Sequence, residues 1–159
     1  IPSSVDEIGS CAFNYCTALS SIVIPDSVTE IEEGAFAECR ALTTVVLSNS
    51  LTEISDYLFS DCTSLSNILI PASVTEIETG AFQRCTSLVS IVIPDSVTEI
   101  EDIAFSECSA LRSVLLPASV TEIGVGAFDK CPNLTLTVFR NSYAERYAQR
   151  NHIPYTYAD

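Results

Sequence analysis

Six of the seven cysteines stand 23 residues apart, and thiols at a regular spacing could form a disulfide framework, a metal site or a redox relay. They are Cys16, Cys39, Cys62, Cys85, Cys108 and Cys131. Zinc sites use closely spaced ligand pairs that converge on one ion, so one cysteine per 23 residues does not supply such a site. A fixed period of this length is typical of a solenoid, in which each repeat forms one coil stacked on the next.

In a solenoid these cysteines form a column with about the 5 Å spacing of stacked strands. An unstrained disulfide needs Cβ atoms about 3.8 Å apart, so the column disfavours disulfides. We interpret the ladder thiols as buried, free and nearly apolar groups, each paired weakly with a neighbouring carbonyl. Cys11 lies outside the ladder, at a position usually held by glycine, and is also expected to be free.

A second ladder consists of one glutamate per unit. Its members are Glu7, Glu30, Glu53, Glu76, Glu99 and Glu122. A calcium site needs about 6–8 oxygen ligands around one point, and a linear row offers about two, so weak calcium binding is the less favoured interpretation. The preferred one is a solvated convex surface, on which neighbouring threonines separate the charges.

No catalytic constellation accompanies these ladders. His152 is the only histidine, it has no partner motif, and packing or helix capping explains it better than catalysis. The phosphate-binding, nucleophile-elbow and zinc-protease motifs are absent. We therefore expect a protein that is not an enzyme, with no catalytic residue, no metal site and no cofactor.

The chain divides into six units of 23 residues, beginning at Ile1, Ile24, Leu47, Ile70, Ile93 and Leu116. Eight positions of each unit are apolar or small almost throughout, including the phenylalanine, cysteine and leucine of an A-F-x-x-C-x-x-L segment. A single unit cannot bury these side chains, whereas stacked coils can bury them against one another.

Each unit contains segments of different periodicity. Its last residues are β-branched and predict a short strand that ends before a proline, as at Pro25 and Pro94. The V-T-E-I segment predicts a second short strand with valine and isoleucine inward. The spacing of A-F-x-x-C-x-x-L predicts a short α or 3₁₀ turn, preceded by glycine at Gly34, Gly80 and Gly126. Unit three departs from the repeat pattern at two places, where Ser48-Asn49 replaces the proline and Tyr57-Leu58 replaces Gly-Ala. We expect a local irregularity there.

The repeated pattern L-x-x-I-x-I-P-x-x-V-x-x-I-x-x-x-A-F-x-x-C resembles the Treponema pallidum-type, or BspA-like, leucine-rich repeat. The resemblance covers residues 1–138 and implies a curved α/β solenoid with a parallel sheet on its concave side. Members of that family are mostly large surface or secreted proteins associated with adhesion. The resemblance therefore implies an extracellular or cell-surface location and a binding role, with a spacer or scaffold segment as the alternative.

The charge distribution limits the classes of partner that the protein can bind. The formal net charge is −14, and residues 1–129 hold 19 acidic and 3 basic side chains. Such an acidic body repels phosphate backbones and anionic lipids, so it disfavours nucleic acid and membrane surfaces as partners. No apolar run approaches the roughly 18 residues of a membrane span, so we expect no direct membrane insertion.

The candidate binding surface is the concave face, where the outward residues of the long strands form an aliphatic stripe beside a stripe of small polar groups. It comprises Ser21, Val23, Thr44, Val46, Asn67, Leu69, Ser90, Val92, Ser113 and Leu115. Such a patch can mark an interaction surface for a protein or glycan. The alternative is an ordinary sheet surface chosen for strand propensity, because the stripe lacks the tryptophan, tyrosine and arginine that anchor strong interfaces.

The repeat loses its phase after Leu134, and residues 139–159 predict a C-terminal cap on the array of residues 1–138. Ser142 to Glu145 form a capping box for a helix to about Arg150, and Ile153, Tyr155 and Tyr157 alternate as a final strand. The N-terminal end has no such cap and exposes a coil edge. We therefore predict weak self-association through that end.

Overall fold

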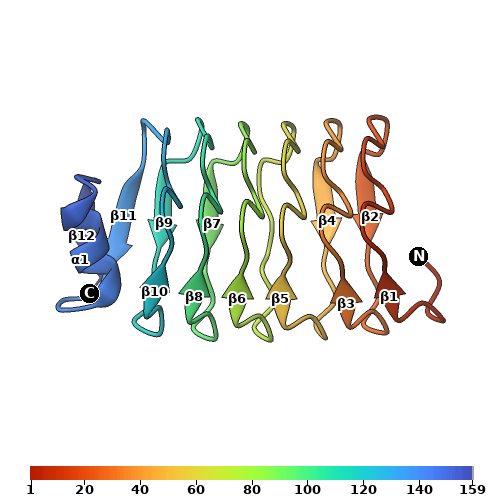
Figure 1. Ribbon diagram of the computed structural model, residues 1–159, viewed down its shortest axis with the longest axis horizontal. Coiled ribbons are helices and arrows are strands. Elements are labelled where there is room, and N and C mark those ends of the chain that lie inside the picture. Colours follow the sequence, from red (N-terminus) through yellow and green to blue (C-terminus); the bar gives the residue numbers. More distant parts are fainter. Residues whose placement is uncertain (159) are drawn as a thin grey trace.

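A computed structural model describes residues 1–158 as a single row of stacked coils that ends in a helix-containing cap (Figure 1). Each 23-residue unit runs once around the coil, so residues one period apart lie side by side. The predicted solenoid is therefore confirmed, and it is built from parallel strands.

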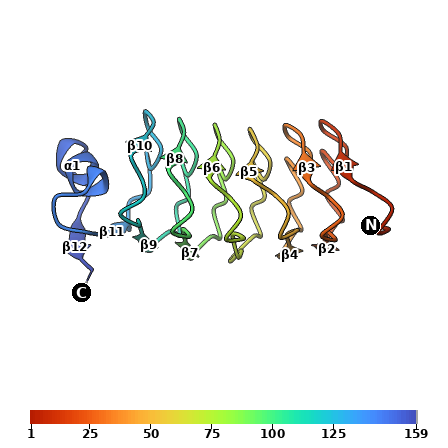
Figure 2. The ribbon, with the colours of Figure 1, turned by 90° about the horizontal axis from the view of Figure 1, so that it is seen from below.

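Two kinds of strand line the coils, on opposite sides of the row (Figure 2). The short Glu-Ile strands are β1 (Glu7–Ile8), β3 (Glu30–Ile31), β5 (Glu53–Ile54), β6 (Glu76–Ile77), β8 (Glu99–Ile100) and β10 (Glu122–Ile123). The longer strands are β2 (Ser21–Val23), β4 (Thr44–Val46), β7 (Ser90–Val92), β9 (Ser113–Leu115), β11 (Thr135–Val138) and β12 (Tyr155–Tyr157). All pairs are parallel, and within the repeats the register is one period, as for Ser21 with Thr44.

Both sheets are interrupted at unit three, where the prediction of a long strand in every unit is wrong. Asn67–Leu69 is not a strand, although Ile68 is buried and its neighbours are exposed as in the other units. In the same coil Leu58 is fully buried at a position where most units have alanine. The Phe59 ring lies 5.8 and 5.6 Å from the rings on either side, the longest such distances in the stack. In the sheet of short strands, the Ser55 hydroxyl donates to the Ile31 carbonyl, whereas the corresponding carbonyl of Ile54 accepts the backbone N–H of Glu78.

The core is a set of continuous side-chain columns. Six phenylalanines, one per coil from Phe13 to Phe128, stack nearly parallel, with centroids 5.1 to 5.8 Å apart. Phe36, Phe59, Phe82 and Phe105 are fully buried, whereas Phe13 is only partly buried at the open end. Offset aromatic stacking and area burial together make this column a large share of the stability of each coil.

The segment before each ladder cysteine forms consecutive single turns, each closed by a bond from an N–H to the carbonyl three residues earlier, so the predicted short turn is present but does not extend into a helix. The N–H of Phe36 donates to the carbonyl of Leu58 in the next coil at 3.1 Å. Its neighbours Ala35 and Ala37 instead donate to carbonyls three residues earlier in their own coil. Because alternate N–H groups point to the next coil, the segment cannot close the repeated hydrogen bonds of a helix.

The C-terminal helix α1 spans Tyr143–Arg150, close to its predicted bounds, and is the one helix of residues 1–158. Ser142 accepts the N–H of Glu145 at 3.0 Å as expected of an N-cap. The reciprocal bond differs from a capping box, because Glu145 accepts from the N–H of Asn141 instead of Ser142. Tyr147 meets the Phe128 ring edge-on at 6.2 Å and so covers the last ring of the stack.

Candidate functional site

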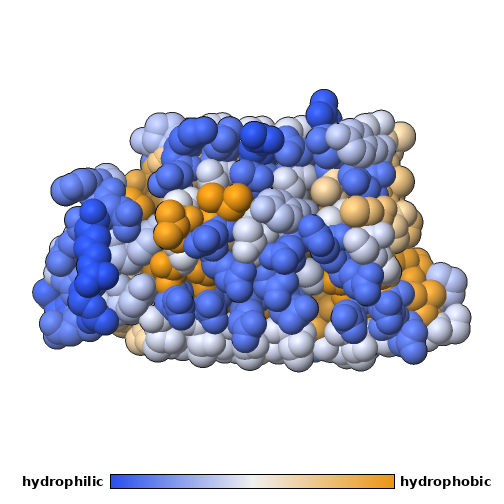
Figure 3. Space-filling view, in the orientation of Figure 1, coloured by the Kyte–Doolittle hydropathy of each residue, from blue (hydrophilic) through white to orange (hydrophobic). Residues whose placement is uncertain are grey.

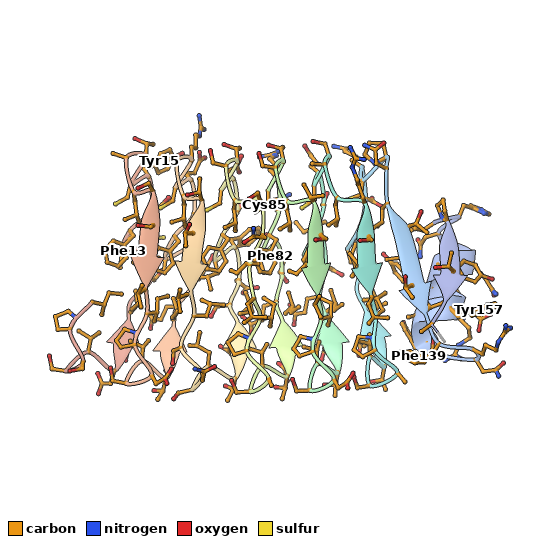
Figure 4. The ribbon with its side chains drawn as sticks, turned by 180° about the vertical axis from the view of Figure 1, so that it is seen from behind. Phe13, Tyr15, Phe82, Cys85, Phe139 and Tyr157 are labelled. Carbon is orange, nitrogen blue, oxygen red and sulfur yellow. The ribbon has the colours of Figure 1, made fainter. Side chains whose placement is uncertain are left out.

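The long strands present the predicted residues on one surface, which we call the sheet face and define as residues 20–23, 43–46, 66–69, 89–92 and 112–115. Figure 4, drawn from behind, shows these strands toward the viewer. All ten predicted site residues are exposed there. The five aliphatic ones expose between 39% and 78% of their surface, with Leu115 the lowest and Leu69 the highest.

Strand register brings these residues together in two stripes. Val23 lies beside Val46, and Val92 beside Leu115, while the small polar residues pair in the neighbouring column. The intervening residues, such as Ile91 and Val114, are buried in the core. A rigid backbone therefore holds the exposed aliphatic groups at about the 4.8 Å spacing of paired strands.

The cap extends the same columns with polar side chains. Leu115 pairs with Thr137 on β11, and Thr137 pairs with Thr156 on β12. The aliphatic stripe therefore ends at Leu115, and threonines continue it toward the C-terminus. Asn133, the acceptor of a glycosylation sequon, lies nearby and donates its amide to the carbonyl of Ser109 at 3.1 Å.

Acidic side chains are absent from the sheet face. The chain has 21 of them, and none falls within the five segments that make up this face. Within residues 1–158 they lie instead on the Glu-Ile strands, on the turns that connect the strands and, for Glu145, on α1. This segregation leaves the sheet face as an extended surface without negative charge on a strongly acidic protein.

Arg112 is the only charged residue of the sheet face, and the two predicted stripes did not include it. It precedes β9, its side chain is exposed, and no acidic side chain of residues 1–158 forms an ion pair with it. Its backbone joins the sheet, because its N–H donates to Val89 and its carbonyl accepts from Thr135, both at 2.9 Å. The signal was present in the repeats themselves, since this position holds Ser, Thr, Ser and Val in the other units of the face.

The opposite side of the coils carries the glutamate ladder and is predominantly hydrophilic (Figure 3). A hollow of about 290 Å³ is lined there by Glu30, Glu53, Asp56 and Glu78, among others. Burial, reinforced by Glu53 and Asp56, raises the pKa of Glu78 to about 7. Among residues 1–158, however, no cluster of side chains has the arrangement of a metal site.

The cysteine ladder is structural. All seven cysteines are free. Each thiol from Cys39 to Cys131 donates to the phenylalanine carbonyl 26 residues earlier, as Cys62 does to Phe36 at 3.2 Å. Burial raises the pKa of Cys39 to about 11. One prediction is wrong for the first coil, because Cys16 is exposed there instead of buried.

A histidine and a cysteine line one hollow, of about 340 Å³, between the last coil and the cap; its lining residues include Cys131, His152 and Lys130. The Cys131 thiol donates to the carbonyl of Phe105 at 3.1 Å, and burial raises its pKa to about 11. An activated cysteine requires a lowered pKa, so this pair does not supply a nucleophile. His152 has a φ of 55° and follows the helix C-cap, in agreement with the capping interpretation.

The geometry of the molecule thus supports non-covalent contact on a broad face better than chemistry in a cleft. The sheet face is built on paired strands, exposed, partly aliphatic and free of acidic groups. Of the two hollows described above, one is lined by carboxylates, and in the other the Cys131 thiol is already hydrogen-bonded to a backbone carbonyl. No helix among residues 1–158 has the length and apolar character needed to cross a bilayer.

Fold and surface together define a parallel-strand repeat solenoid. The model of the BspA type leucine rich repeat region matches residues 1–111 and 76–149, with six copies. The chain belongs to this leucine-rich repeat family. A search of curated proteins finds no match.

Solved structures extend the comparison. A leucine-rich cell surface protein of Faecalibacterium prausnitzii is 43% identical with a TM-score of 0.70, over 72% of this chain and 30% of that one. The Treponema pallidum leucine-rich repeat protein is 38% identical with a TM-score of 0.72, over 74% of this chain and 58% of that one. The pneumococcal vaccine antigen PcpA is 29% identical with a TM-score of 0.74, over 86% and 36%. The chain thus spans less than two thirds of the length of these relatives.

Proposed function

We propose that this protein is a non-enzymatic binding module of a cell-surface or secreted protein, and that it contacts a protein or glycan ligand through the sheet face. The observation that carries the proposal is the segregation of charge: all 21 acidic residues lie outside a face whose aliphatic side chains are exposed. Strand propensity disfavours aspartate and, to a lesser degree, glutamate, but the short strands of the same coils each carry a glutamate, so propensity alone does not explain the exclusion of acidic residues from the sheet face.

Two similarities support a surface location. One structural relative is described as a cell surface protein and another as a pneumococcal vaccine antigen. The binding mode we propose is broad and modest in affinity, because the face lacks tryptophan and tyrosine, which anchor tight interfaces. Affinity then increases with the number of coils that contact the ligand.

The alternative is a structural spacer that holds other domains away from a surface. The continuous phenylalanine stack favours it, since a column of buried rings along the whole array stiffens the solenoid. A spacer needs no exposed aliphatic stripe, so the two functions make different predictions for changes on the sheet face.

The test is a paired substitution on the sheet face, Val46→Asp with Val92→Asp, applied to binding on arrays of extracellular matrix proteins and glycans. The binding module loses its ligand, because two buried carboxylates are left without partners in the interface. The matched control is Ala72→Asp with Ala118→Asp, at exposed positions where units two and five have aspartate. Equal behaviour of both variants and the unchanged protein would leave the spacer as the function.

A further inference from the structure

The charge pattern of the sheet face restricts what can occupy it. Arg112 is its one charged group, it is exposed, and it has no ion pair within residues 1–158. The other basic residues of the array have partners: Arg40 binds Glu38 at 2.6 Å, and Lys130 binds Glu107 at 2.9 Å. Arg84 lies between Asp61 and Glu107 at 3.5 and 3.4 Å.

The position of Arg112 within the face is defined by backbone bonds. It lies between Val89 and Thr135 in the ladder, at the end of the face nearest the cap. Leu115, the last residue of the aliphatic stripe, lies three residues further along the chain and pairs with Thr137, so the cation and the end of the stripe are about 10 Å apart on one strand. The two ends of the face therefore differ: it is aliphatic over most of its length and carries one positive group at the end nearest the cap.

We propose that the occupant of the sheet face is a protein segment that presents aliphatic side chains to the stripe and a carboxylate to Arg112. This inference rests on the proposed binding function and specifies the partner. The guanidinium is a fork of donors that matches a carboxylate in two hydrogen bonds. Sugar rings are a poorer match, because this face offers aliphatic groups and no aromatic ring on which a sugar could stack.

Charge complementarity supports a single, local carboxylate in place of an extended acidic ligand. The protein carries a net charge of −14, so a highly acidic partner is repelled at long range. A partner that is close to neutral, with one acidic side chain at the end of an apolar segment, meets Arg112 without that penalty. A rim charge of this kind adds specificity and association rate more than bulk affinity.

The experiment uses two blocked synthetic peptides of alternating threonine and valine, one ending in aspartate and one ending in asparagine. Each is titrated into the full chain labelled with ¹⁵N, and amide shifts are followed by NMR. We expect shifts at Val92, Leu115 and Thr135 with both peptides, and a roughly three- to tenfold tighter binding of the aspartate peptide. In Arg112→Gln this preference disappears, while the weaker binding of the asparagine peptide remains.

The matched control is Arg84→Gln, which removes the same charge away from the sheet face and keeps the preference. Equal binding of the two peptides to the unchanged protein overturns the role of Arg112 and leaves the proposed function standing. Shifts confined to the Glu-Ile side, or no shifts on the sheet face at all, overturn both. A preference for aspartate that survives Arg112→Gln also refutes the inference.

Discussion

In the turns, the first residue of each coil with a left-handed backbone conformation alternates between glycine and a residue with a side chain, a two-coil pattern within the 23-residue repeat. The first left-handed position of each coil holds, in order, Cys11, Gly34, Tyr57, Gly80, Ile103 and Gly126, all with φ between 50° and 66°. Side chains and glycines alternate along this column. A Cβ added at Gly80 would lie 2.5 Å from the Tyr57 ring, and one at Gly126 would lie 3.4 Å from Ile103. The side chain of one coil thus occupies the space that the next glycine leaves.

Replacing Gly80 with alanine is therefore expected to destabilise the protein more than replacing Gly34. Both alanines would adopt a left-handed conformation, which costs about 1–2 kcal/mol. At Gly80 the new methyl group must also displace the Tyr57 ring, at a further cost of about 1–2 kcal/mol. At Gly34 the nearest atom is the Cys11 sulfur at 3.4 Å, so only the backbone cost remains. Urea unfolding of the two variants measures the difference.

A double-mutant cycle isolates the contact. In a Tyr57→Gly background, Gly80→Ala should lose the extra cost and resemble Gly34→Ala, because the ring is gone. An unchanged cost in that background would mean that the ring is not what alanine displaces.

Thiol reactivity tests the cysteine ladder directly. Cys11 and Cys16 are exposed, so they should react quickly with a disulfide reagent at pH 8 in the native protein. Burial raises the pKa of Cys39 and Cys131 to about 11, and that of Cys62, Cys85 and Cys108 still further, so their thiols stay protonated and react slowly. Fast reaction of all seven thiols without denaturant contradicts this assignment. So does a count of fewer than seven reactive thiols after denaturation.

The residue-scale predictions from sequence succeeded where one residue type repeats in one environment. The ladder cysteines were expected to be free and bonded to carbonyls, and from Cys39 onward they are. Exposure at Cys16 was missed because the repeat pattern assigns the same environment to every unit, whereas the thiol in the first coil of residues 1–158 is exposed. Arg112 was missed because a pattern of shared positions leaves out a residue that occurs in one unit only.

Among the structural elements, the phenylalanine column carries the clearest stability prediction. Phe36→Ala should cost about 3–5 kcal/mol, as for a fully buried aromatic side chain that leaves a cavity. Phe13→Ala should cost only about 1–2 kcal/mol, because Phe13 is partly buried and stacks on one side. Urea unfolding of both variants provides the comparison. Equal costs would indicate that the open end is protected in solution.

Strands and turns were predictable to different degrees. The alternation of apolar and polar residues predicted which side chains of both strand types point inward, and the Glu-Ile strands lie where the V-T-E-I segment predicted them. The break at unit three was expected only as a local irregularity, since the repeat pattern does not show that the Ser55 hydroxyl bonds to the Ile31 carbonyl in place of a backbone N–H. The predicted turn bonds are present, but the apolar spacing did not reveal that alternate N–H groups of this segment donate to the next coil.

At the scale of the whole molecule, the concentration of carboxylates opposite the sheet face makes stability depend on pH. Burial raises the pKa of Glu78 from its usual 4.5 to about 7, and burial and neighbouring carboxylates also raise the pKa values of Glu53 and Glu99. A raised folded-state pKa means that the folded protein holds protons which the unfolded chain releases between pH 4.5 and 7. Stability should therefore fall as the pH rises through this window.

Glu78→Gln should remove most of this dependence and stabilise the protein at pH 8 by about 1 kcal/mol, since solvent screens a partly exposed carboxylate. The glutamine oxygen can still accept the N–H of Asp56, which Glu78 accepts at 3.0 Å. Thermal unfolding at pH 5 and pH 8, in low and moderate salt, measures the effect. A variant that keeps the full pH dependence would place its origin elsewhere.

The two ends of the row differ, and this difference predicts how copies of the chain meet. At the C-terminal end Tyr147 covers the last phenylalanine ring, and β12 is the last strand of the sheet. At the N-terminal end Phe13 is partly exposed, and Figure 3 shows hydrophobic surface there. Ala12 is exposed, whereas Ala35 and Ala81, its counterparts in interior coils, are fully buried. Strands β1 and β2 each have one unpaired edge, which another strand can satisfy.

We therefore expect weak, concentration-dependent pairing of two chains through their N-terminal ends, detected by light scattering coupled to size exclusion. Ala12→Asp should abolish it without affecting the fold, because the new carboxylate is hydrated in the single chain and buried in the pair. Thr156→Asp, an exposed position in the cap, should leave pairing intact. A strict monomer at high concentration would show that the open end is solvated without a partner. Loss of pairing in Thr156→Asp alone would place the contact at the cap.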